Sequence, residues 1–145
     1  MKYFVYILLL VLCSCGNVKT IYTKGELYPK SYPINQIFEK FNAGGLDKSV
    51  IVFTGWFEKD SIKIVNGGKI IFEEPVNTKP ETGFSTFWVA SNEEKIEVIV
   101  PNPKGIKITF KQEDLKKYKF VYISRDDYKR DKYEIEYSNK WKKFM

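Results

Sequence analysis

From Lys48 to Ser138 the chain is built of short apolar runs, many alternating apolar and polar residues with a period of two. Successive side chains of a β-strand point to opposite faces, so runs of this kind predict half-buried strands. Turn-forming residues such as Asn66-Gly67-Gly68 separate the runs. The predicted strands are Ser49–Phe57, Ser61–Val65, Lys69–Phe72, Phe84–Ala90, Lys95–Val100, Ile106–Phe110, Tyr118–Ser124 and Lys132–Ser138. No helical pattern alternates with them, so we expect residues 47–145 to form an all-β domain, an antiparallel β-sandwich.

One local motif bears on the topology of that sandwich. Asp114 precedes Tyr118 by four positions, and Phe120 follows Tyr118 by two. This spacing resembles the tyrosine corner of immunoglobulin-like domains. The resemblance implies an immunoglobulin-like sandwich in which the Tyr118 ring joins the core and its hydroxyl bonds to the backbone. A jelly roll is the alternative topology, and a plain turn followed by a core tyrosine is the alternative interpretation of the motif.

The segment before the strands predicts one short amphipathic helix within residues 34–46. Its apolar residues fall at helical spacing on one face, at Ile34, Ile37, Phe38 and Phe41. Pro33 suits a first helical turn, and Gly44 with Gly45 suits a helix end. Residues 15–33 contain two prolines and no sustained period, so we expect a tether there. The composition of Thr20–Thr23 leaves an N-terminal strand as the alternative.

The first fifteen residues have the pattern of an export signal. Phe4–Leu12 is an unbroken apolar run that spans about 14 Å as a helix, too short to cross a bilayer comfortably. Leu12, Ser14 and Cys15 follow it in an arrangement that resembles the bacterial lipobox. The resemblance implies a signal peptide over residues 1–14, cleavage by the type II signal peptidase before Cys15, and a covalent lipid on the Cys15 sulfur. Cys13 departs from the commonest lipobox pattern, and an ordinary signal peptide is the alternative.

A lipidated Cys15 would make the membrane the first partner of the chain, because acyl chains bury many methylene groups. The chain resembles small β-sandwich lipoproteins of diderm bacteria, which implies the cell envelope as its location. Gly16 stands where the enterobacterial sorting rule places Asp to retain a lipoprotein in the inner membrane. That resemblance implies the outer membrane.

The composition argues against most enzyme classes. The 145 residues include no histidine, and Cys13 and Cys15 are the two cysteines. The commonest general base, the commonest metal ligand and the Ser-His and Cys-His pairs are therefore missing. Acidic residues occur in adjacent pairs, which point to opposite faces when they lie on a strand. Asp126, Asp127 and Asp131 lack the ordered spacing of an EF-hand loop. We therefore expect no catalysis, no cofactor other than the covalent lipid, and no metal.

The positive charge is concentrated near the C-terminus. Residues 116–145 hold ten basic and five acidic side chains, whereas residues 15–115 hold thirteen of each. Basic and aromatic residues together can bind nucleic acid, but export makes that partner improbable. The candidate binding surface comprises Trp56, Trp88, Trp141, Lys140, Lys142 and Lys143. The alternative is that the aromatic residues fill the core while the lysines lie in solvent.

Three functions follow as hypotheses. The favoured one is a non-catalytic, lipid-anchored module that binds or scaffolds an envelope protein or a glycan. The alternative is an inhibitor or immunity protein directed against a toxin or a wall-degrading enzyme. A hydrolase that uses carboxylates is less well supported, because it needs two facing carboxyl groups across a groove.

Overall fold

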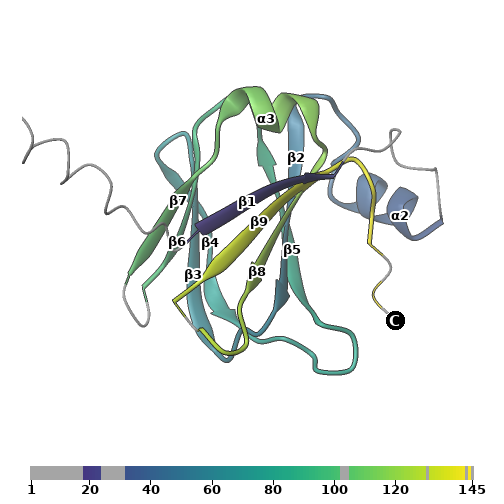
Figure 1. The fold of residues 1–145 in the computed structure, drawn as a ribbon. Coiled ribbons are helices and arrows are strands. Elements are labelled where there is room, and N and C mark those ends of the chain that lie inside the picture. Colours follow the sequence, from purple (N-terminus) through teal and green to yellow (C-terminus); the bar gives the residue numbers. More distant parts are fainter. Residues whose placement is uncertain (1–17, 24–31, 102–104, 130, 143, 145) are drawn as a thin grey trace, which may run out of the picture.

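The computed structural model describes residues 18–23, 32–101, 105–129, 131–142 and 144. These residues form nine strands in two sheets that pack face to face, with two short helices beside them (Figure 1). The predicted all-β sandwich is therefore confirmed. Leu12, Ser14 and Cys15 lie outside the described residues. Among the described residues, no helix has the length and apolar character needed to cross a bilayer.

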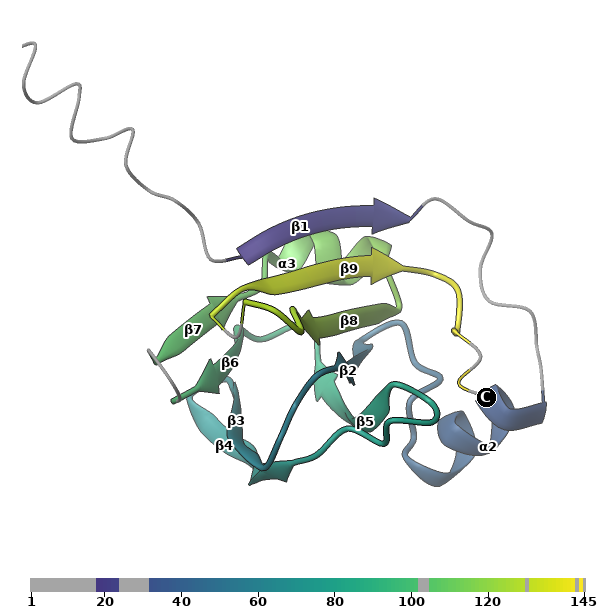
Figure 2. The same ribbon diagram turned by 60° about the horizontal axis from the view of Figure 1, so that its bottom comes forward.

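The larger sheet has five strands in the order β1-β9-β8-β2-β5. Their bounds are β1 (Val18–Thr23), β9 (Tyr133–Ser138), β8 (Phe120–Arg125), β2 (Lys48–Gly55) and β5 (Phe84–Ser91). The smaller sheet has four strands in the order β4-β3-β6-β7. Their bounds are β4 (Lys69–Val76), β3 (Asp60–Asn66), β6 (Ile96–Val100) and β7 (Ile106–Thr109). Figure 2 shows the two sheets from a second direction, with α2 beside β5.

Two strand pairs depart from a purely antiparallel arrangement. β1 pairs with β9 in parallel, and β2 pairs with β8 in parallel. In an immunoglobulin sandwich the strand that follows the tyrosine corner lies in an antiparallel sheet. Here that strand is β8, and its neighbour β2 runs parallel to it, so the immunoglobulin-like order is not reproduced. The Tyr118 ring does pack with those of Tyr22 and Tyr137, but its hydroxyl makes no hydrogen bond among the described residues.

The tether expected over residues 15–33 needs a correction, because Val18–Thr23 forms β1. This strand adds to the edge of the larger sheet beside β9, with Val18 opposite Tyr133 and Thr23 opposite Ser138. Its alternation places Tyr22 on the side of Tyr137, where the two rings stack at 5.3 Å. Pairing to an existing edge stabilises a short strand whose own sequence signal is weak.

The helices also differ from the sequence-based bounds. α2 spans Tyr32–Lys40, so it begins two residues before the start of the predicted range and ends six residues before the end of that range. The chain turns at Asn42, which has a positive φ of 49°, and the Ala43 amide bonds to the Phe38 carbonyl. α3 spans Gln112–Lys117, in the segment for which a plain turn was the alternative to a tyrosine corner, and it buries Leu115.

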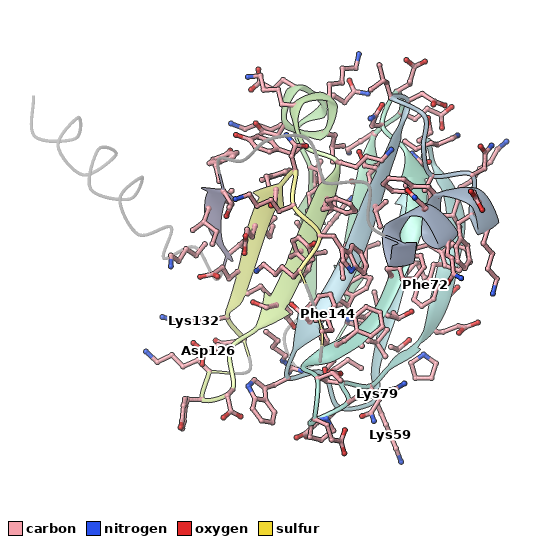
Figure 3. All side chains as sticks on the ribbon, turned by 90° about the vertical axis from the view of Figure 1, so that its right-hand side faces the viewer. Lys59, Phe72, Lys79, Asp126, Lys132 and Phe144 are labelled. Atoms are coloured by element: carbon pink, nitrogen blue, oxygen red, sulfur yellow. The ribbon has the colours of Figure 1, made fainter. Side chains whose placement is uncertain are left out.

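Apolar residues form two clusters. The larger cluster fills the space between the sheets and includes Phe53, Phe57, Ile64 and Ile123. The smaller one lies on the outer face of the larger sheet, around Val50, Val52, Phe120 and Tyr122. Phe38 of α2 covers one side of the smaller cluster, and Trp141 and Phe144 of the C-terminal segment cover the other (Figure 3 labels Phe144). Seven of the eight aromatic side chains between residues 116 and 145 are thereby packed; Tyr128 is exposed.

Candidate functional site

The three tryptophans of the expected surface lie at three separate positions. Trp141 packs on the outer face of the larger sheet, with its ring 6.4 Å from that of Phe87. Trp88 is the next residue of β5 and so points to the opposite face, where its ring lies 5.2 Å from that of Phe72. Trp56 follows β2 and is 49% exposed. The structure does not bring these rings onto one surface.

The lysines of the expected surface do not gather into a free basic patch. Lys142 forms an ion pair with Glu136, and its ammonium lies 4.8 Å from the centre of the Tyr122 ring. The Tyr122 hydroxyl donates to the carbonyl of Lys140 and accepts from the Lys142 amide. Lys143 lies outside the described residues. The contacts of the C-terminal segment therefore fasten it to the sheet.

A different feature separates one part of the surface from the rest, namely the free edge of β5. The sandwich has four edge strands, β1 and β5 in the larger sheet and β4 and β7 in the smaller sheet. Exposed sheet edges template pairing with other chains, and proteins blunt them with charged residues and proline. Three of these strands carry such residues: Lys19 on β1, Lys107 on β7, and Lys69, Glu73, Glu74 and Pro75 on β4. β5 contains no charged residue and no proline over its eight residues.

Hydrogen bonds of β2 show which backbone groups of β5 are free. The amide of Val50 donates to the carbonyl of Lys119 at the start of β8, so Val50 faces β8 and not β5. Val50 lies opposite Val89. Backbone groups alternate in direction along a strand. Phe87 and Val89 therefore turn their N–H and C=O groups away from β2, toward the edge where no described strand lies.

One end of that edge already holds a side chain in the position of an added strand. The Asn66 side chain donates to the Ser91 carbonyl at 3.0 Å and accepts from the Ser91 amide at 2.9 Å. Ser91 belongs to the same alternating set as Val89 and Phe87. The Asn66 amide thus makes with Ser91 the two hydrogen bonds that a neighbouring strand would make. The next two positions of the set have no such partner among the described residues.

A shallow hollow of about 460 Å³ runs along this edge. Its floor includes Val89, Ala90 and Ser91 of β5, and Ile71 of β4 lies on the side of the smaller sheet. Trp88, 37% exposed, belongs to the same lining. The remaining lining residues are Phe41, Asn42, Lys48 and Asn66. A hollow lined by both apolar and polar side chains, beside free backbone donors and acceptors, suits an extended peptide.

Buried contacts fix the wall of this hollow. The Phe41 ring meets the Phe87 ring edge-on at 5.0 Å. The Lys119 ammonium donates to the carbonyls of Gly45 and Lys48, at 2.7 and 2.9 Å, and so ties down the connection between α2 and β2. Burial lowers the pKa of Lys119 to about 8. The wall that carries Phe41 is therefore held by packing and hydrogen bonds inside the domain.

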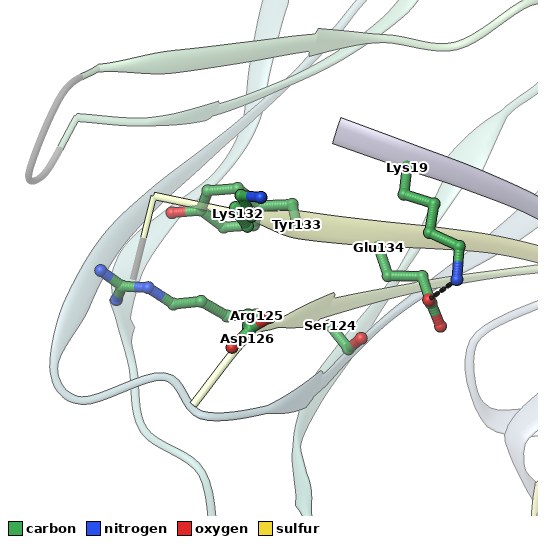
Figure 4. A pocket seen from close by; sticks show the side chains of 7 residues that line it. All are labelled: Lys19, Ser124, Arg125, Asp126, Lys132, Tyr133 and Glu134. Atoms are coloured by element: carbon green, nitrogen blue, oxygen red, sulfur yellow. Dashed lines mark hydrogen bonds and ion pairs between the residues drawn. The ribbon is translucent and has the colours of Figure 1, made fainter. Parts of the chain in front are cut away.

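A second hollow, of about 410 Å³, lies where β1 begins and β8 ends (Figure 4). It has mixed charge, since Lys19 pairs with Glu134 at 3.0 Å and Lys132 and Asp126 lie on the same lining. Arg125 is buried and paired with Asp60, with the two atoms 2.5 Å apart. Tyr133 is also in the lining; its hydroxyl is buried with no hydrogen-bond partner among the residues that the structure describes, and burial raises its pKa.

The two acidic side chains that line the second hollow, Asp126 and Glu134, have partners within the domain. The Asp126 carboxylate accepts hydrogen bonds from the backbone amides of Tyr128 and Lys129, which is a turn-stabilising role. Within the described ranges, no group of three or more acidic, histidine or cysteine side chains is placed to hold a metal ion. The β5 hollow offers free backbone donors and acceptors beside apolar side chains.

Sequence reasoning found the β5 strand but not its role. The sequence feature that could have pointed to this edge is the absence of any charged residue or proline between residues 84 and 91. It becomes informative only when the strand order places β5 at an edge. A scan against protein-family models, a search of curated proteins and a search of solved structures each return no match for this chain.

Proposed function

We propose that this protein is a lipid-anchored, non-catalytic module of the cell envelope that binds an extended segment of another protein by strand addition to β5. The observation that carries the proposal is the uncharged free edge of β5, with the N–H and C=O groups of Phe87 and Val89 turned outward. The lipid anchor on Cys15 and the location in the outer membrane belong to the same proposal and depend on the lipobox resemblance.

Strand addition explains the particular shape of the site. Each backbone hydrogen bond formed with the guest contributes about 0.5–1.5 kcal/mol net, and the pairing is independent of the guest's side chains. Side chains of an added strand alternate between two directions. One direction meets Trp88 and Ile71, and the other meets Phe41 and Asn42. Apolar residues at alternate positions of the guest would therefore give specificity.

The test is photo-crosslinking in intact cells with benzoylphenylalanine in place of Phe41, on the wall of the hollow. The same group in place of Lys107, on the charged edge strand β7, is the matched control. We expect a discrete protein adduct from position 41 and none of the same size from position 107. Adducts of equal size and yield from both positions would contradict a specific site at β5.

Substitution of Val89 tests the mode of binding. Its N–H points outward, so Val89→Pro removes a donor for the guest without removing a bond to β2. Val89→Ala keeps the N–H and removes most of the side chain. We expect the position-41 adduct to disappear with Val89→Pro and to persist with Val89→Ala. An adduct that survives Val89→Pro, or one that glycosidase digestion removes, would reject strand addition, and the second result would support a glycan partner instead.

The anchor has its own test. Cys15→Ala should abolish incorporation of labelled fatty acid and release the domain from membranes. Continued labelling of this variant would refute the assignment of Cys15 as the lipidated residue. Neither result alters the expectation for the β5 edge.

A further inference from the structure

Four strands of the larger sheet share one row of residues at their ends. Val18 of β1 lies opposite Tyr133 of β9, Tyr133 opposite Arg125 of β8, and Arg125 opposite Gly55 of β2. β1 is parallel to β9, β9 is antiparallel to β8, and β8 is parallel to β2. The start of β1, the start of β9, the end of β8 and the end of β2 consequently lie at the same end of the sheet.

The turns that follow β2 and β8 define one end of the sandwich, which we name the proximal end, comprising residues 56–59, 126–129, 131 and 132. Figure 3 shows Lys59, Asp126 and Lys132 toward this end, away from α3. The hollow that contains Lys19 and Lys132 opens beside it. α3, the turn at Gly67 and Gly68, and the end of β5 at Ser91 belong to the opposite end of the molecule.

The proximal end lies very close along the chain to the proposed lipid anchor. Only Gly16 and Asn17 separate Cys15 from Val18. Three residue steps reach at most about 11 Å even when the chain is fully extended. The long tether expected over residues 15–33 would have let the domain stand well away from the bilayer. With β1 beginning at Val18, the anchor holds the proximal end at the membrane surface.

The side chains at this end suit a headgroup layer. Trp56 is 49% exposed and Tyr128 is 93% exposed, although most aromatic residues of the chain are packed. Tryptophan and tyrosine favour the interface between lipid and water, where a ring meets apolar groups and its polar atom meets water. Residues 126–132 hold three basic and three acidic side chains, and Arg125 beside them is buried against Asp60. A balanced mixture complements zwitterionic headgroups, each with one phosphate and one ammonium, better than a strongly anionic surface.

We propose that the proximal end is a membrane-contact surface, seated on zwitterionic phospholipid headgroups with Trp56 and Tyr128 at the interface. This inference rests on the lipid anchor of the proposed function. Lys19 and Lys132 lie toward headgroup phosphates, and Asp126 and Glu134 lie within the same mixed-charge hollow. Lys48, Asn66 and Ser91 of the β5 hollow then lie toward the end of the sandwich that faces away from the bilayer.

The experiment places benzoylphenylalanine at single positions of the full chain in cells grown with radioactive phosphate. Tyr128 and Trp56 are the test positions, and Lys116, exposed on α3 at the opposite end, is the matched control. The diacylglycerol of a lipoprotein anchor contains no phosphorus, so phosphate label that appears only after irradiation cannot come from the anchor. Labelled fatty acid, measured in parallel without irradiation, reports the anchor.

We expect phosphate label on the protein from positions 128 and 56 and none from position 116. In vesicles, the yield from position 128 should be retained when anionic lipid is replaced by phosphatidylethanolamine. Two results would overturn the membrane-contact surface while the fatty-acid label shows that the anchor is intact. One is equal phosphate label from positions 128 and 116, and the other is a protein adduct from position 128. Loss of the fatty-acid label from the unsubstituted chain would overturn the anchor, and the membrane-contact surface with it.

Discussion

β4 and β5 are neighbouring edge strands with opposite surface chemistry. Both are eight residues long, they lie on the same side of the sandwich, and the rings of Phe72 and Trp88 join them at 5.2 Å. β4 carries two glutamates and a proline near its end, whereas β5 carries only uncharged residues. The solvent is the same for both, so the difference is a property of the sequence.

The contrast supports the role proposed for the β5 edge. An unprotected edge exposes a protein to aggregation, and β4 shows that this chain contains the residues that prevent it. On the β5 edge, Asn66 bonds to the N–H and C=O groups of Ser91, whereas those of Val89 and Phe87 have no such partner among the described residues. An edge that is closed at one end and open along its middle has a defined register for a guest strand. Each prediction below tests one element of this contrast.

The largest effect should come from moving a proline by one residue along β5. Trp88 faces β2, so Trp88→Pro removes a ladder hydrogen bond and should lower the free energy of unfolding by about 2–4 kcal/mol beyond the loss seen for Trp88→Ala. Val89 faces the free edge, so Val89→Pro should differ from Val89→Ala by less than about 1 kcal/mol. Urea unfolding of the detergent-solubilised mature chain measures all four variants. Equal losses at the two positions would contradict the outward direction of the Val89 amide.

Asn66→Ala should have the next largest effect, because it removes the side chain that stands in for a strand. The Ser91 amide and carbonyl would lose their partner, at a cost of about 1–3 kcal/mol if water does not replace it. Hydrogen exchange gives the more specific measurement. In the unsubstituted protein the amides of Trp88, Ala90 and Ser91 should be protected and those of Phe87 and Val89 should exchange rapidly. In the Asn66→Ala variant the Ser91 amide should also exchange rapidly, whereas the Ala90 amide should stay protected from exchange.

A smaller effect is expected from removing the protection of β4. The combined variant Lys69→Thr, Glu73→Thr, Glu74→Val and Pro75→Thr gives that strand an edge without charge or proline, like that of β5. The Lys63–Glu73 pair is lost, but an exposed pair of this kind contributes only about 0–1 kcal/mol. We expect concentration-dependent dimers by sedimentation equilibrium, with little change in unfolding. A variant that stays monomeric at every concentration would show that the charges and the proline of β4 are not what keeps that edge unpaired.

The sequence predicts the strands far better than it predicts their neighbours. Alternation identifies β3, β6 and β9 because each has one buried face, and a local pattern is enough for that. The parallel pairing of β2 with β8 depends on contacts between segments about 70 residues apart, which no local pattern encodes. β1 was only an alternative because its six residues gain their stability from β9. The β5 site could not be predicted because an edge is a property of the strand order.

The last and smallest prediction concerns the charged edge at β7 under acid. Glu97 of β6 lies between Lys107 and Lys95, at 2.7 and 2.8 Å, and the hydrogen bond from Lys107, with that from Lys95, lowers the pKa of Glu97 to about 2. Its usual value of 4.5 applies to the unfolded chain, so the stabilisation is present above pH 4.5 and is lost as the pH falls through about 2. Glu97→Gln and Lys107→Met should each flatten the rise of stability between pH 2 and 4.5, measured by urea unfolding at several pH values. Crosslinking at the β5 hollow should be the same in both variants, because Glu97 and Lys107 belong to the smaller sheet and do not line that hollow. If either variant lost the position-41 adduct while it remained folded, the two edges would be coupled, and the division between protected and binding edges would fail.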